Sequence, residues 1–303
     1  SQALLDYGGE QAQARMKRLL ASDFQSSSLT PEDKKMLRYV SYTTIWVPSS
    51  IESGMGKLYI AATSKDRDTS PEDRTQAAQL SRAQEQLRTF KSTIQDFPGN
   101  PSLVVDRKLP TGAYAQVGGL IVLSPDFLNR MDEKDPVKQL VLAHELSHLY
   151  KRHTIKEMQY QLITSSTGFG LAKKLLSRSG IEGGSNPLEM AKNAVTLAST
   201  TRELFDWVRG HQVSFGIDQE LEADGCSVQW MNRVGLDPKP LVPALAELEA
   251  VQKDNPSGYV KTHPTNAQRR SNLLAATGQK PALANQAKVA RAASAPASKV
   301  RKP

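Results

Sequence analysis

The chain is poor in cysteine and histidine, and it lacks long apolar runs. One cysteine, Cys226, occurs among 303 residues, which excludes an internal disulfide and a metal site built from several thiolates. No run of eighteen or more apolar residues is present, so we expect no transmembrane span. Ser1 is not followed by a basic segment and an apolar core, so no targeting peptide is visible, although a processed start would look the same. Any metal site must therefore use histidine and carboxylate side chains.

Acidic residues are absent after Asp254. Six lysines and arginines lie between Lys280 and Lys302, in a stretch rich in Ala, Ser and Pro, and they supply most of the net charge of +8. We therefore predict a disordered basic tail over residues 276–303. Nucleic acid is not an expected partner, because no basic face interleaved with aromatic residues accompanies the charge. Contact with a membrane surface stays open, either through this tail or through a lipid anchor lost ahead of Ser1.

The remaining pattern favours helices with a little β-structure. Ser70 and Pro71 are a helix start signal, and the helix is expected to run to about Phe97. Residues 102–106 and 115–124 are short β-rich runs that we predict to be adjacent strands, the second of them at a sheet edge. We also predict an extended segment over residues 39–47, because they are rich in β-branched and aromatic side chains. The expected fold is α+β and mostly helical, with a small β-sheet.

The segment LVLAHELSHLYKRH, Leu140 to His153, holds three of the five histidines. We predict a helix from residue 135 to about 154. Four residues turn a helix through about 400°, so His144 and His148 would share one face, one turn apart. This is the spacing of a two-histidine metal clamp. Glu145 would point about 100° around the helix, beside the metal position, where the general base for a water nucleophile belongs.

The segment ELEAD supplies a third ligand, which a catalytic zinc site needs in addition to two histidines. Glu220 and Asp224 lie four residues apart, so both face the same way on a helix. Glu220 can then reach the metal, while Asp224 fixes a ligating histidine from behind.

A three-histidine pattern does not fit. It requires glycine and histidine at the third and sixth positions after His148, where this chain has Lys151 and Thr154. His153 falls one residue short and would sit about 140° from His148 on a continuous helix. We therefore expect His153 to face outward or onto a second face and not to be a ligand.

HELSH, ELEAD and THPTNAQRRSNL follow one another in an order that resembles the M48 family of zinc metallopeptidases. The resemblance covers roughly residues 98–275, which would form the zincin-like catalytic domain with the sheet above the HExxH helix. Residues 1–97 would be a helical and extended region packed on it. The resemblance implies one Zn²⁺ per chain. It matches the zinc ligands to His144, His148 and Glu220, the catalytic base to Glu145, and the residue supporting a ligand to Asp224.

Two further residues match the family in the THPTNAQRR segment, and their roles stay open. His263 resembles a regulatory fourth ligand of soluble periplasmic relatives, but it could equally stabilise an oxyanion or be a plain loop residue before proline. Arg269 matches the arginine of the family and would support the substrate carbonyl or brace the loop. The segment AYAQVGGLIVLSPDFLNRM resembles the edge strand of the family, so Gly118, Gly119 and Leu120 are the expected strand for an extended substrate.

The resemblance implies a zinc-dependent endopeptidase that cleaves unfolded or misassembled polypeptides. Since the membrane spans of some family members are missing, the soluble subgroup and the bacterial periplasm or cell envelope are favoured. A chaperone-like assembly factor that keeps an autoinhibited protease fold is the alternative. The two differ in whether function depends on Glu145.

Overall fold

The computed structural model describes residues 2–22, 28–64, 71–109, 112–130, 136–178, 187–211, 213–253, 263 and 267–279. Within these ranges helices predominate and three short strands form one sheet, which confirms the mostly helical α+β prediction. None of the helices described is long and apolar enough to cross a membrane. The helices are α1 (Gln2–Ala21), α2 (Pro31–Thr43), α3 (Ser49–Ser64), α4 (Pro71–Ser92), α5 (Pro125–Arg130), α6 (Pro136–Tyr150), α7 (His153–Thr164), α8 (Phe169–Arg178), α9 (Pro187–Gly210), α10 (Ile217–Arg233), α11 (Leu241–Lys253) and α13 (Ala267–Ala276).

The sheet separates two apolar cores. Its order is β1 (Ser102–Val105), β3 (Leu120–Leu123), β2 (Ala113–Gln116), with β1 parallel and β2 antiparallel to β3. Alternate β3 side chains enter different cores: Leu120 and Val122 join the core of α1–α3 and α7–α9, whereas Ile121 and Leu123 join that of α4, α6, α10 and α11. Because both faces of β3 are covered, all four of its residues are apolar and buried.

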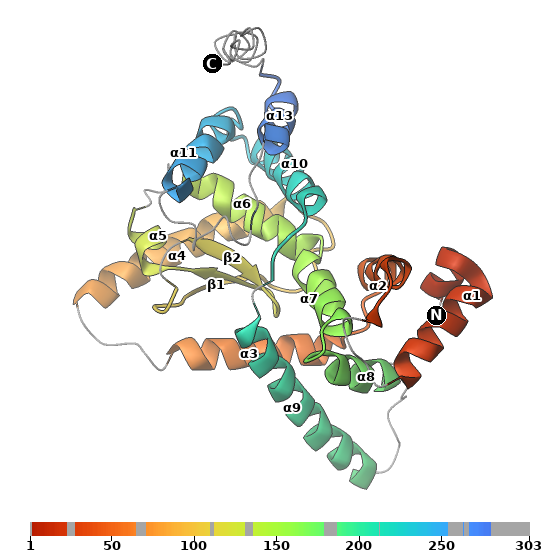
Figure 1. Cartoon of the computed structure of the whole chain (residues 1–303). Coiled ribbons are helices and arrows are strands. Elements are labelled where there is room, and N and C mark those ends of the chain that lie inside the picture. The colour runs from red at the N-terminus through yellow and green to blue at the C-terminus, as the bar shows by residue number, and fades with distance from the viewer. Residues whose placement is uncertain are drawn as a thin grey trace, which may run out of the picture.

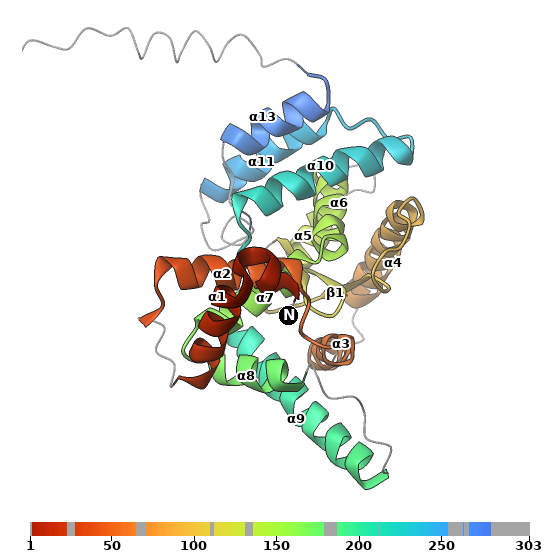
Figure 2. The same cartoon turned by 90° about the vertical axis from the view of Figure 1, so that its right-hand side faces the viewer.

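Figures 1 and 2 show the consequence for the layers of the molecule. Helices α6, α10, α11 and α13 gather on one side of the sheet, and α3, α8 and α9 lie on the other. Helix α6 packs against β2 and, more extensively, against α10. The histidine-bearing helix therefore lies between the edge strand of the sheet and the helix that carries ELEAD.

The prediction of one strand over residues 115–124 is wrong. The run is a hairpin, because Gly118 and Gly119 turn the chain with φ of 98° and 77°, which side chains other than glycine rarely adopt. Leu120 consequently begins the central strand β3, and Gly118 and Gly119 lie in the turn. The edge strand that an extended substrate could join is β2, and not the residues Gly118 to Leu120.

The prediction of an extended segment over residues 39–47 is also wrong for its first half. Residues 39–43 are the last turns of α2, whose first turn is fixed by a capping box between Thr30 and Asp33. Val40 packs in the core beside α7 residues, so burial of a helical face outweighs the β-preference of this sequence. The boundaries predicted between residues 97 and 98 and between 275 and 276 stay predictions, and residues 280–303 lie outside the described part of the chain.

Helix α6 ends at Tyr150, four residues before the predicted end. Arg152 is left-handed, with φ of 61° and ψ of 27°, and the next helix begins at His153. The side chain of Arg152 donates to Glu52 of α3 at 2.7 Å, which holds this turn in place. The chain therefore changes direction directly after the two histidines of HELSH.

Candidate metal centre

Helix α6 presents His144 and His148 on one face, as the four-residue spacing predicts. Both side chains are fully buried, and their Nε2 atoms are 3.0 Å apart. The ring of His148 stacks on Phe215, with centroids 3.8 Å apart and planes inclined by 15°. Phe215 comes from the segment before α10 and restricts the rotation of the His148 ring.

Helix α10 brings two of its acids, Glu220 and Asp224, to these histidines. The Oε2 atom of Glu220 lies 3.3 Å from His144 Nε2, and its Oε1 atom lies 3.4 Å from His148 Nε2. Asp224 Oδ1 is 2.9 Å from His144 Nδ1, on the far side of that ring. Glu220 and Asp224 therefore lie on one face of α10, with Glu220 toward the Nε2 atoms of both histidines and Asp224 behind the ring of His144.

Arg269 of α13 binds both acids from behind. Its Nε and Nη2 atoms donate to the two oxygens of Asp224 at 2.8 and 2.7 Å, and its Nη1 atom is 2.7 Å from Glu220 Oε2. Burial raises the pKa of Asp224, but hydrogen bonds from Arg269 and His144 outweigh burial and hold this pKa below its ordinary value. Arg269 thus fixes the two carboxylates, with all three nitrogens of its guanidinium group turned toward them.

Glu145 is fully buried between α6 and the edge strand. Its Oε2 atom accepts a hydrogen bond of 2.7 Å from the backbone N–H of Ala115 in β2. Burial raises the pKa of Glu145, and the neighbouring His263 and His144 only partly oppose this. A carboxyl group with a raised pKa, held at a fixed place, suits a role as both acceptor and donor of a proton.

His263 lies in the middle of this group and is fully buried. Its Nδ1 atom is 3.1 Å from Glu220 Oε1, and its Nε2 atom is 3.3 Å from Glu145 Oε1. The residues on either side of it, 254–262 and 264–266, lie outside the described residues. The side chain of His263 therefore lies between Glu220, the expected third ligand, and Glu145, the expected base.

His153 does not face outward, which was one of the two orientations predicted for it, but lies behind His148 and outside the group of His144, His148, Glu220 and His263. Only 2% of its surface is exposed, and its Nδ1 atom is 3.0 Å from His148 Nδ1. The prediction fails because it assumed a continuous helix, whereas the left-handed Arg152 turns the chain back toward His148. Glu222, which the sequence reading did not single out, accepts from His153 Nε2 at 3.0 Å.

The donor set fits a zinc ion. Four residues offer one ligand atom each, and these atoms all lie within 4.8 Å of one another: His144, His148, Glu220 and His263. Zinc–ligand bonds of about 2.0–2.1 Å in a tetrahedron place the ligand atoms roughly 3.3 Å apart. The two Nε2 atoms are 3.0 Å apart, and they lie 3.3 Å from Oε2 and 3.4 Å from Oε1 of Glu220, which is close to that value.

The charges around His144 and His148 differ. Burial lowers the pKa of both rings. Glu220 and Asp224 more than offset this for His144, whose pKa is raised to about 9, whereas the pKa of His148 stays well below its ordinary value. A metal ion that binds here displaces a proton from His144.

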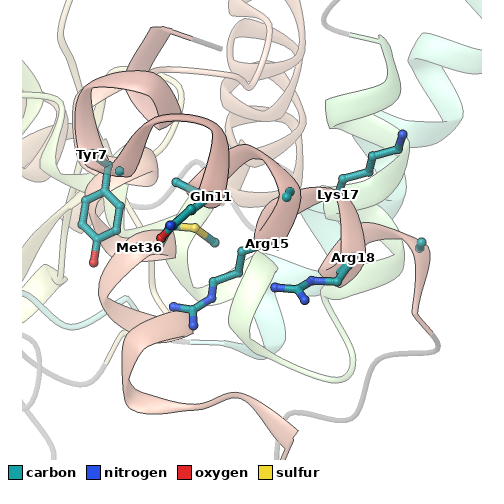
Figure 3. Close-up of a pocket in the computed structure, with 10 residues that line it drawn as sticks. Tyr7, Gln11, Arg15, Lys17, Arg18 and Met36 are labelled. Atoms are coloured by element: carbon teal, nitrogen blue, oxygen red, sulfur yellow. The ribbon is translucent and has the colours of Figure 1, made fainter.

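A hollow on another part of the molecule contains none of these residues. It has a volume of about 710 Å³ and follows the bent helix α1. Figure 3 shows Arg15 and Arg18 on one side of this helix and Lys17 on the other. Arg15 is also paired with Asp33 of α2 at 3.3 Å. The residues that line the hollow include no histidine, carboxylate or thiol, so we assign the chemistry to the buried centre.

Comparison with known proteins agrees with this geometry. The model of "Peptidase family M48" matches residues 75–277, more than half of the chain, and begins upstream of the predicted boundary at residue 98. The beta-barrel assembly-enhancing protease of Escherichia coli K12 is 29% identical over 172 residues, which are 54% of this chain and 32% of that protein. The metalloprotease LoiP of the same organism is 23% identical over 161 residues, 53% of this chain and 56% of that protein.

The chain spans about a third of the length of the first relative and just over half of the second. The matched region contains the complete set of His144, Glu145, His148, Glu220 and Asp224. From the family match and from this buried centre, we conclude that the chain belongs to peptidase family M48 and carries the site of a metalloendopeptidase.

Proposed function

We propose that the protein is a zinc-dependent endopeptidase that cleaves unfolded or misassembled polypeptides in the bacterial cell envelope. The observation that carries the proposal is the convergence of His144, His148 and Glu220 beside a buried Glu145 that is bound to the edge strand. Two imidazoles and one carboxylate are a common ligand set of catalytic zinc, which leaves a coordination position for water or substrate.

Zinc bound to these residues would supply a Lewis acid for the scissile carbonyl and for a water molecule. Glu145 then takes the proton of the attacking water and returns it to the leaving amine. The Ala115 N–H keeps one oxygen of Glu145 in place, so the other oxygen, Oε1, faces the centre. Asp224 and Arg269 contribute by keeping the ring of His144 and the carboxylate of Glu220 in position.

Strand β2 supports the choice of unfolded substrates. Its neighbour on one side is β3, while the N–H of Ala115 points the other way, toward Glu145. Backbone groups of alternate residues point to the same side, so those of Ala113 also face away from β3. A polypeptide can pair with this edge only when its own backbone is extended and free of other hydrogen bonds, which a folded substrate does not offer.

His263 would keep the enzyme inactive at rest. The side chains of His144, Glu145, His148 and Glu220 are all 0% exposed. His263 contacts both Glu220 and Glu145. A substrate carbonyl therefore cannot reach Glu145 until His263 moves away. We propose His263 as a displaceable fourth ligand of the zinc ion.

We propose the bacterial cell envelope as the location of this protein, and a contact with the membrane surface through the basic tail or a lost lipid anchor. The similarity to the beta-barrel assembly-enhancing protease and to the metalloprotease LoiP supports this proposal. A chaperone-like assembly role is the second candidate, and the full burial of the centre favours it, because a closed site can bind clients without cleaving them.

The test is cleavage of casein, an unfolded protein, by zinc-loaded wild type, Glu145→Gln and His263→Ala, with the zinc content of each measured. His211→Ala is the matched control, since this histidine stacks on Trp207 and is not part of the centre. We expect about one zinc per chain, loss of both zinc and activity with a chelator, a fall in turnover of about 10²–10⁴-fold in Glu145→Gln, and a rise in His263→Ala. Zinc binding without cleavage by any variant would support the assembly role instead.

A further inference from the structure

We infer that His153 and Glu222 are positioning residues for the zinc ligand His148, joined to it in a hydrogen-bonded relay. The inference rests on the proposed function, because it assumes that His148 binds zinc through Nε2. His153 and Glu222 do not belong to the HELSH motif or to the group of four residues that could hold the metal ion.

The relay starts at Glu222, on the face of α10 away from Glu220. A carboxylate accepts hydrogen bonds only, so the Nε2 atom of His153, 3.0 Å from Glu222 Oε2, must donate. In a neutral imidazole the other nitrogen is then an acceptor. His153 Nδ1 therefore accepts the proton of His148 Nδ1, which is 3.0 Å away.

The proton on Nδ1 determines the state of Nε2, on the opposite side of the His148 ring. With its proton on Nδ1, His148 presents a lone pair on Nε2, which is the nitrogen 3.0 Å from His144 Nε2 and 3.4 Å from Glu220 Oε1. The tautomer that zinc requires is thus selected by contacts behind the ring. Asp224 does the same for His144 by direct contact, whereas His148 is served through an intermediate histidine.

The backbone is shaped to make this contact. On a straight helix the side chain of His153 would point about 140° away from His148. The left-handed Arg152, directly before α7, directs His153 back, and a residue with a side chain adopts such a conformation only at an energetic cost. Arg152 forms an ion pair of 2.7 Å with Glu52 of α3, and this contact offsets the cost of the left-handed conformation.

Glu222 is itself held in place at the surface. Lys151 Nζ lies 2.6 Å from Glu222 Oε1, which leaves Oε2 for His153. Lys151 and Arg152, the two residues between α6 and α7, thus act on both ends of the relay: one fixes the acceptor, and the other fixes the turn.

The first experiment measures zinc affinity by competition with a chromogenic chelator. We expect His153→Phe, which cannot accept from His148, to bind zinc 10–100-fold more weakly than wild type. His153→Asn keeps an acceptor oxygen near the Nδ1 position and should recover much of the affinity. His211→Phe is the matched control at a histidine outside the centre and should bind like wild type.

A second variant guards against misfolding of the buried His153 variants. The side chain of Glu222 is 45% exposed, so Glu222→Leu should fold normally and still weaken zinc binding about tenfold. In the ¹⁵N spectra of the zinc-loaded wild type, we expect the proton of His148 on Nδ1, that of His153 on Nε2, and scalar coupling between the two Nδ1 nuclei across the hydrogen bond.

Equal zinc affinity in wild type, His153→Phe and Glu222→Leu would overturn the inference, as would a proton found on His153 Nδ1. Because binding is measured without a substrate, these outcomes leave the proposed proteolysis untouched. A wild type that binds no zinc would instead contradict the proposed function and, with it, this relay.

Discussion

Arg269 and Asp224 form a two-pronged ion pair from which solvent is excluded. The Arg269 side chain is 1% exposed and that of Asp224 is 0% exposed, and two hydrogen bonds of 2.7 and 2.8 Å join them. The pair connects α13 to α10 directly behind His144. Removing one partner of such a pair leaves a buried charge without compensation, which costs far more than the loss of a surface ion pair.

We therefore predict that Arg269→Met lowers the free energy of unfolding of the zinc-free protein by roughly 3–5 kcal/mol. The measurement is urea unfolding followed by circular dichroism. Arg270→Met is the control, because the neighbouring Arg270 is half exposed and its partner Glu249 is only partly buried, so its loss should cost less than that of Arg269, about 1 kcal/mol. Similar losses in the two variants would contradict the structural role of Arg269.

Gln159 provides a second test of a buried polar residue, on the other side of the sheet. Its Oε1 atom accepts from the N–H groups of Trp46 and Val47 at 2.7 and 3.0 Å, and its Nε2 atom donates to the carbonyls of Ser41 and Thr44 at 3.0 Å. Gln159 thus provides hydrogen-bond partners for backbone groups in the last turn of α2 and in the segment that follows it.

Gln159→Leu would leave these buried groups without partners, at a cost of about 1–3 kcal/mol each. We expect a total loss of at least about 3 kcal/mol in urea unfolding. Gln161→Leu, two residues along α7, removes only a weak bond of 3.5 Å to Glu157 and should change the stability by less than about 1 kcal/mol. A wild-type-like Gln159→Leu would show that water replaces the lost bonds.

Cys226 allows a test of burial through pH. The thiol is 9% exposed, and burial raises its pKa, which nearby Lys151 only partly opposes. A raised pKa means that less thiolate is present at a given pH in the folded chain than in the unfolded chain. Since the thiolate is the reactive form, iodoacetamide at pH 8 should modify the folded protein at least about tenfold more slowly than the urea-unfolded protein. Equal rates would place Cys226 at the surface.

Local geometry explains which parts of the centre could be predicted from the sequence. His144 with His148, and Glu220 with Asp224, are placed by the helical repeat alone, so their spacing was sufficient once each segment formed a helix. His153 could not be placed in this way, because its position depends on a left-handed Arg152 that no residue type announces.

The same distinction applies to the strands. The apolar run at residues 115–124 is predicted to be one strand, but the two glycines inside it form the turn of a hairpin. The contact between Ala115 and Glu145 follows from that turn, since it makes β2 the edge beside α6. Sequence therefore predicted the ligands within single helices, and it failed where a change of chain direction joins separate elements.

Gly56, in the segment SGMG of α3, packs against Gly118 in the turn of this hairpin. A Cβ atom on Gly118 would lie 2.5 Å from Gly56 Cα, and one on Gly56 would lie 2.9 Å from Gly118 O, so the two backbones touch. Because Gly118 also has φ of 98°, Gly118→Ala combines a clash with backbone strain, whereas Gly56→Ala causes the clash alone.

We predict that both alanine variants lower the free energy of unfolding, Gly56→Ala by about 1–3 kcal/mol through overpacking, and Gly118→Ala by more. Gly225→Ala in the interior of α10 is the opposite control, since a Cβ atom there meets nothing within 4 Å, and alanine should stabilise the helix by up to about 1 kcal/mol. Thermal and urea unfolding of the three variants would decide. If Gly118→Ala were as stable as Gly225→Ala, α3 and the β2–β3 turn would not be in direct backbone contact, and the sheet edge beside Glu145 would need another support.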